Sequence, residues 1–282
     1  ADAVSISALT SATSLTSIVV NATHASSVTT DITSGAVAFG ANTHIDGSGS
    51  TAPLVIDVDG QTVAGNGVRI SGGDGADTLT ASGVNADLVQ GNGGIDTIDI
   101  TADGATAEIV TVRSEVTTTA SADSITGFET AEDQFDYNGT LSNGTGGGSV
   151  AAAEVASSTT IALALATAGA ANDTVFIATT DLAAGDETAL DAFVAAPSAS
   201  LATATVDAFL ATGGALNGTI ANLDSVVGAG DSVLFQFSTN TDTVVFLITN
   251  TDTSTADTLT SAEVNLVGAF VAATDLVAAD YA

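Results

Sequence analysis

The sequence predicts a mainly β fold, in which a short parallel coil continues into β-sandwich-like regions with few short helices. Three observations predict it. Hydrophobic residues make up 45% of the chain, and many of them are β-branched, which suits a pleated sheet. The apolar runs are short and are bounded by Gly, Asp, Ser and Thr. In the middle of the chain, Gly and Asp also recur at a fixed spacing, as repeated structural units do.

The first segment, residues 1–65, is predicted to form short strands in Ser/Thr-rich loops. The candidate strands are Val4–Ile6, Ile18–Val20, Ala36–Phe39 and Leu54–Val58. Asp57 and Asp59 lie beside a glycine, a pattern that fits either a solvated turn or an extra cation site. We favour the turn.

Three further segments follow. Residues 66–140 contain the Gly/Asp spacing and a strand-like run, Ala107–Val112. Residues 141–150 are Gly-rich and are predicted to be a linker, because Gly/Ser runs offer no side chains to pack. Residues 151–282 are predicted to form a C-terminal β-rich domain. Its expected elements are two short helices (Asp186–Val194 and Ala202–Leu210) and a hairpin of Val233–Phe237 with Val244–Ile248. Glu263–Phe270 fits either a further strand or a short helix, and we favour the strand.

The charge and composition exclude several classes of protein. Two Arg and no Lys stand against 33 acids, giving a net charge of −31, so nucleic acid and anionic membrane surfaces are not expected partners. The absence of Cys excludes disulfides and thiolate metal sites. No apolar run is long enough for a transmembrane helix, so no membrane insertion is expected. The only histidines, His24 and His44, are expected to be surface or turn residues, and we predict no enzyme activity.

One motif indicates specific chemistry. Residues 72–80 have the form G-G-x-G-x-D-x-L-x, and residues 91–99 repeat it with Asn in place of the second Gly. A degraded copy between them retains Asp87. The aspartates Asp77, Asp87 and Asp96 are spaced by 10 and then 9 residues. In a stacked coil with one turn and one strand per repeat, Asp77 and Asp96 should lie on the same side and Asp87 on the opposite side.

These residue types suit a hard cation. Glycine permits tight turns whose carbonyl groups can point inward, and aspartate supplies charged oxygen, the ligand that Ca²⁺ prefers. We therefore predict a hard divalent cation as the bound ion. Within the repeats, the candidate metal-binding residues are Gly73, Asp74, Gly75, Asp77, Asn85, Asp87, Gly91, Gly93 and Asp96.

The motif resembles the calcium-binding nonapeptide repeats of the repeats-in-toxin (RTX) family, which form a parallel β-roll. Residues 123–136 contain D-x-I-x-x-F followed by D-x-x-D, which looks like the segment that often closes such a roll. The resemblance therefore implies Ca²⁺ as the bound ion and adds Asp123, Asp133 and Asp136 to the candidate metal-binding residues. The resemblance implies a calcium-binding β-roll or β-helix over residues 66–140. It also implies type I secretion directed by a signal at the C-terminus, and folding where calcium is abundant.

The resemblance and the composition together favour a calcium-dependent, self-assembling extracellular structural protein. We expect a surface-layer or filament/sheath subunit at the cell surface of a Gram-negative bacterium, with other copies of itself as its main partner and a cell-surface polysaccharide as a further candidate. The alternative is a calcium-stabilised secreted adhesin or glycan-binding module. A third hypothesis is an accessory domain of an extracellular hydrolase.

Overall fold

The structure is a computed structural model of the 282-residue chain. It describes residues 15–23, 28–31, 39, 43–59, 67–82, 85–100, 111–114, 118–130, 132–137, 155–158, 175–178, 182, 184–217, 219–221, 230, 232–239, 241–251, 256–273, 276–277 and 280–281.

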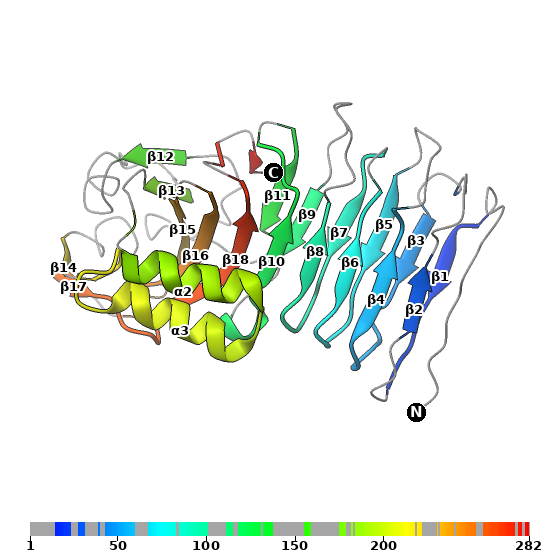
Figure 1. Cartoon of the computed structure of the whole chain (residues 1–282), viewed down its shortest axis with the longest axis horizontal. Coiled ribbons are helices and arrows are strands. Elements are labelled where there is room, and N and C mark those ends of the chain that lie inside the picture. Colours follow the sequence, from blue (N-terminus) through cyan, green and yellow to red (C-terminus); the bar gives the residue numbers. More distant parts are fainter. Residues whose placement is uncertain are drawn as a thin grey trace.

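Within the described residues up to Tyr137, successive strands alternate between two sheets, and all the strands within each sheet run parallel (Figure 1). We call this part the parallel half. The described strands of its first sheet, the six-stranded sheet, are in spatial order β1 (Ser17–Val19), β3 (Thr43–Asp46), β5 (Val68–Ser71), β7 (Leu88–Gln90), β9 (Thr111–Ser114) and β11 (Gln134–Tyr137). Its second sheet contains β2 (Val28–Asp31), β4 (Leu54–Asp57), β6 (Thr78–Thr80), β8 (Thr97–Asp99) and β10 (Asp123–Thr126).

Aliphatic side chains stack in rows inside the parallel half, because each strand is in register with the next. In the second sheet the paired and buried residues are Ile56, Leu79, Ile98 and Ile125. In the six-stranded sheet they include Ile45, Ile70 and Val89. Each such side chain contributes about 1.5–3 kcal/mol when fully buried. These stacked rows form part of one continuous core.

The second sheet continues into a mixed half. Strand β10 pairs in parallel with β18 (Val264–Val271), with Ile125 opposite Phe270. In the described residues this sheet then extends through β16 (Thr243–Thr249), β15 (Ser232–Ser238), β13 (Val175–Ala178) and β12 (Val155–Ser158), which makes ten strands in all. The strands β15 and β16 form an antiparallel hairpin. A separate antiparallel pair consists of β14 (Thr219–Ala221) and β17 (Ala256–Thr258).

Two helices, α2 (Ala184–Ala195) and α3 (Ala199–Leu210), pack on one face of the mixed half, as Figure 1 shows. The helix α3 begins after Ser198, whose Oγ accepts a hydrogen bond from the Leu201 N–H at 3.4 Å. Buried aromatic rings fill the contact with the sheet. The ring centroid of Phe209 lies 4.8 Å from that of Phe246 and 5.6 Å from that of Phe237. A 3₁₀ turn, η1 (Thr119–Ser121), precedes β10.

The last described residues tie the two sheets together. Tyr281 forms a parallel bridge with Phe135 of β11, and their rings make an edge-to-face contact at 6.1 Å. The Tyr281 hydroxyl donates a hydrogen bond to Gln236 Oε1 of β15 at 2.5 Å. Gln236 Nε2 in turn donates to the Leu276 carbonyl at 3.0 Å. These residues therefore contact an outer strand of the six-stranded sheet and an inner strand of the ten-stranded sheet.

The predicted mainly β fold with two short helices is confirmed, as are the hairpin and the strand proposed for Glu263–Phe270. Residues 141–150, Val4–Ile6 and most of Ala36–Phe39 lie outside the described residues. Both sheets run continuously past residue 65, and the ten-stranded sheet joins strands from all three predicted β-rich segments.

Candidate functional site

Three aspartates lie in line where neighbouring strands of the ten-stranded sheet begin. Asp77 and Asp96 directly precede β6 and β8, and Asp123 is the first residue of β10. The strands pair so that Thr97 lies beside both Thr78 and Ser124, which puts the three aspartates at the same level. We call Asp77, Asp96 and Asp123 the carboxylate row. The row brings together three of the residues that the sequence analysis proposed as metal ligands.

Each carboxylate in the row accepts a hydrogen bond from a backbone N–H of the adjacent layer. The donor is the residue beside it in the preceding strand of the same sheet. Asp123 Oδ1 accepts from the Asp96 N–H at 3.1 Å, Asp96 Oδ1 from the Asp77 N–H at 2.8 Å, and Asp77 Oδ1 from the Leu54 N–H at 2.7 Å. Asp77 Oδ2 also accepts from the Gly73 N–H at 2.6 Å. These buried N–H groups would otherwise lack a partner, so the aspartates hold successive layers of the coil together.

Asp87 does the same in the six-stranded sheet, where it directly precedes β7. Its Oδ1 accepts from the Val68 N–H at 2.7 Å and its Oδ2 from the Ser82 N–H at 2.7 Å. Asn85, also buried, donates through Nδ2 to Ser82 Oγ at 3.4 Å. Asp87 and Asn85 are therefore associated with the other sheet, and they do not belong to the carboxylate row.

Asp96 differs from its neighbours, because its Oδ2 is buried and has no hydrogen-bond partner among the described residues. This oxygen lies against Gly91, where any β-carbon would overlap it. A β-carbon on Gly72 would likewise overlap Asp77 Oδ2 and would lie only 2.5 Å from the Gly91 carbonyl oxygen. Glycine at positions 72 and 91 thus leaves room for two carboxylate oxygens close to a backbone carbonyl.

Burial and mutual repulsion make the row unfavourable as three free anions. Burial raises the pKa of Asp96 to about 9, and the negative charges of Asp123 and Asp77 add to the rise despite the hydrogen bond from the Asp77 N–H. Burial also raises the pKa of Asp77 to about 6, against the effect of its two backbone hydrogen bonds. The pKa of Asp123 is raised for the same reason. The row therefore requires either protons or a cation to neutralise it.

The chemistry of the row fits calcium, with a contribution from the backbone. Ca²⁺ takes six to eight oxygen ligands from carboxylates, carbonyl groups and water. Asp96 Oδ2, which has no hydrogen-bond partner among the described residues, is such an oxygen, whereas Asp77 Oδ2 already accepts the Gly73 N–H. Within the described ranges, no three His, Cys, Asp or Glu side chains converge as a metal site. Backbone carbonyls would therefore have to complete the coordination.

The glycine turns stack directly on one another. The Gly73 carbonyl accepts a hydrogen bond from the Gly93 N–H at 2.9 Å, and the exposed Asp74 donates its N–H to the Ser50 carbonyl at 2.8 Å. A β-carbon on Gly75 would lie 2.6 Å from the backbone of the preceding turn, at Ala52. The small residues of the motif therefore permit close contact between neighbouring turns.

The remaining predicted ligands lie near β11. Asp133 is buried, and its Oδ2 accepts from the Glu129 N–H at 2.8 Å. Asp136 is half-buried within β11 itself. In the first segment, Asp57 Oδ1 accepts from the Asp59 N–H at 3.0 Å, an exposed contact of the kind found in turns.

The sequence analysis did not single out several buried carboxylates of the mixed half. Asp242 Oδ1 accepts from the Ala272 N–H at 2.8 Å, and Asp186 Oδ2 from the Ala215 N–H at 2.8 Å. Glu263 accepts hydrogen bonds from two threonines through both their N–H and hydroxyl groups, which lowers its pKa although burial opposes this. Only Asp186 had a sequence signal, its place in the first turn of a predicted helix.

None of the family models, curated proteins and solved structures compared with the chain matches it. Among the described residues, no helix is long and apolar enough to cross a membrane.

Proposed function

We propose that this chain is a calcium-dependent, self-assembling extracellular structural protein, a surface-layer or filament/sheath subunit of a Gram-negative bacterium. The observation that carries the proposal is the carboxylate row, with its buried and unpartnered Asp96 Oδ2. The proposal includes the finer fold assignment, a calcium-binding parallel β-roll built from the repeats of residues 66–140.

The case for calcium rests on the cost of burying the row without a cation. Three buried carboxylates repel one another, and the pKa of each is raised. A divalent cation held by oxygen ligands removes this repulsion without protonating the acids. Asp96, Asp77 and the Gly91 carbonyl are the groups that we assign to it, and Asp123 contributes negative charge from the next strand.

Cation binding would couple folding to location. The chain carries a net charge of −31, and its carboxylates repel one another most strongly where divalent cations are scarce. An ion that binds the folded chain and not the unfolded chain stabilises the fold in proportion to the logarithm of its concentration. The protein would thus remain poorly folded inside the cell and fold outside it, where calcium is abundant.

A structural role suits the side chains better than a catalytic one. The buried carboxylates of Asp77, Asp87 and Asp242 accept hydrogen bonds from backbone N–H groups and so stabilise the fold. The chain contains no Cys or Lys and only two His. It therefore offers few of the nucleophiles and bases on which enzymes rely. Stacked strands with outer edges are suited to contact other copies.

Negative-stain electron microscopy in calcium and in excess EGTA tests the proposal. We expect ordered sheets or filaments in calcium that disperse in EGTA. The variant Asp96→Asn should assemble poorly in calcium, whereas Asp207→Asn, which removes the same charge from an exposed position on α3, should assemble normally. Dispersed monomers of the wild-type protein in both conditions would contradict the proposal and favour the adhesin or glycan-binding alternative.

A further inference from the structure

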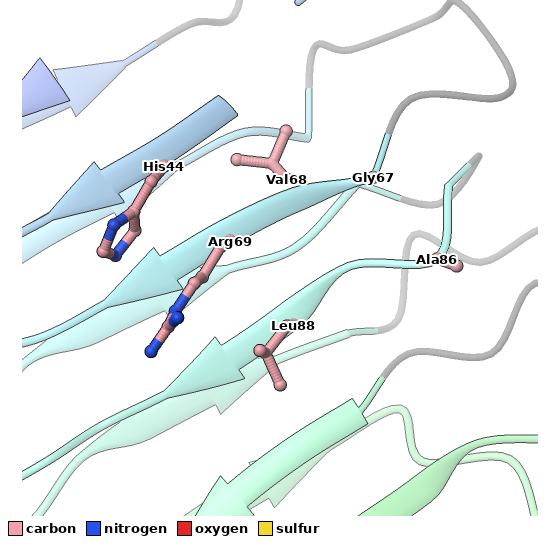
Figure 2. A pocket seen from close by; sticks show the side chains of 6 residues that line it. All are labelled: His44, Gly67, Val68, Arg69, Ala86 and Leu88. Atoms are coloured by element: carbon pink, nitrogen blue, oxygen red, sulfur yellow. The ribbon is translucent and has the colours of Figure 1, made fainter. Parts of the chain in front are cut away.

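A groove of about 470 Å³ lies on the outer side of the six-stranded sheet, lined by His44, Gly67, Val68, Arg69, Ala86 and Leu88. His44 of β3, Arg69 of β5 and Leu88 of β7 are register partners and form a row across three strands. Figure 2 shows the imidazole and the guanidinium side by side, extending from neighbouring strands in the same direction.

The groove holds an unusual charge for this chain. Arg69 is exposed and is one of only two basic Lys or Arg residues, against 33 acids. No carboxylate among the described residues forms an ion pair with Arg69. The neighbouring Asp46 carboxylate feels the positive charge of Arg69, but its hydrogen bonds come from the Ser48 N–H at 3.1 Å and the Ser48 hydroxyl at 2.6 Å. The guanidinium therefore remains available to an external anion.

We propose that this groove binds the carboxylate of an acidic side chain from a second copy of the chain. The inference rests on the proposed self-assembly and names one of its contacts. Charge complementarity identifies the occupant, because a second copy brings a surface rich in carboxylates to a cationic groove. A cationic partner would be repelled at this position by Arg69.

The shape and chemistry of the groove suit such a contact. A guanidinium can hold both oxygens of a carboxylate through two parallel hydrogen bonds. His44 Nε2 lies 3.0 Å from Ser71 Oγ, so its ring is held in place beside Arg69. Gly67 packs tightly against the Ala86 carbonyl at one end of the groove, and Leu88 offers an apolar wall to the methylene groups of an incoming Asp or Glu.

The test compares the two arginines, because each change to Gln alters the net charge equally. The concentration needed for assembly in calcium would be measured by sedimentation velocity for the wild type, Arg69→Gln, Arg69→Lys and Arg113→Gln. We expect Arg69→Gln to raise the concentration needed for assembly about tenfold, because the substitution removes a charge pair from the interface. Arg69→Lys should have a smaller effect, because lysine retains the charge and loses the two-pronged geometry. Arg113→Gln should match the wild type.

Thermal unfolding of each variant first establishes that it folds, which we expect for Arg69 because the residue is exposed. An equal loss of assembly in Arg69→Gln and Arg113→Gln would overturn the inference, since it would reflect net charge alone. Normal assembly of Arg69→Gln would also overturn it, while the proposed function would stand. Failure of the wild-type protein to assemble would instead overturn the proposed function, and with it the self-contact.

Discussion

Replacing Asp96 by Asn should have opposite effects on stability with and without calcium. The substitution retains an oxygen that can accept the Asp77 N–H, as Asp96 Oδ1 does now. It removes the negative charge that burial and Asp123 disfavour. Without calcium the variant should therefore be more stable than the wild type at neutral pH. In calcium it should lose the stabilisation that the ion gives to the wild type.

The magnitude follows from the pKa of Asp96. Because that pKa rises from 3.8 to about 9, the folded protein at neutral pH must bind a proton that the unfolded chain does not. At about 1.4 kcal/mol per pH unit, the rise to neutral pH destabilises the wild type by about 4 kcal/mol. Asn avoids this cost but buries an unpaired N–H group, which offsets about 1–3 kcal/mol. A net gain of about 1–3 kcal/mol remains in EGTA.

Urea unfolding at neutral pH, in EGTA and in calcium, measures both effects. Calcium at about 100 times its Kd should stabilise the wild type by about 2.7 kcal/mol and Asp96→Asn by much less. The control, Asp207→Asn, should follow the wild type in both conditions. The reasoning would be refuted if Asp96→Asn were less stable than the wild type in EGTA, or if calcium stabilised both proteins equally.

The other predictions concern the glycine turns, the core and pH. Gly94→Ala should destabilise the fold by about 1–3 kcal/mol in urea unfolding, because Gly94 has φ +106° and the new methyl would overlap the Gly75 carbonyl. The control is Gly185→Ala, in the first turn of α2, where a new β-carbon would meet nothing within 4 Å. This variant should be as stable as the wild type or more stable by up to about 1 kcal/mol. Ile98→Ala should cost about 2–5 kcal/mol by the same measurement, and a loss below about 1 kcal/mol would contradict the stacked core. In EGTA, the contribution of the row to the free energy of unfolding should be greatest below about pH 4. It should fall as pH rises from there through about 6 and on to about 9, because the raised pKa values of Asp77 and Asp96 favour the protonated folded state. Urea midpoints that rise over this range would contradict the assigned burial.

Part of this architecture could be predicted from local sequence patterns. The hairpin of β15 and β16 follows from two apolar runs around a polar turn, and the two helices follow from apolar residues spaced by three and four. The spacing of the Gly/Asp motifs predicted the alignment of Asp77 with Asp96, which the register of β6 and β8 shows. In each case the pattern that predicts the feature lies within a short stretch of the sequence.

The remainder depends on contacts that are distant in sequence. The parallel pairing of β10 with β18 joins residues more than a hundred positions apart, so no local pattern marks it. The same applies to the bridge between Phe135 and Tyr281. The Gly/Asp pattern predicts metal ligands and gives no sign that the aspartates accept backbone N–H groups from the preceding layer. Residue type alone does not separate these roles, because a carboxylate oxygen accepts a hydrogen bond or binds a cation equally well.

The most direct test of the central claim is a crystal structure of the protein grown in calcium, with anomalous scattering used to locate the ion. The account predicts a calcium peak at the carboxylate row, about 2.3–2.6 Å from Asp96 Oδ2. Asp96→Asn crystals should lack that peak. An ordered row without any peak, in crystals saturated with calcium, would show that protons neutralise the carboxylates and would contradict the calcium-dependent mechanism.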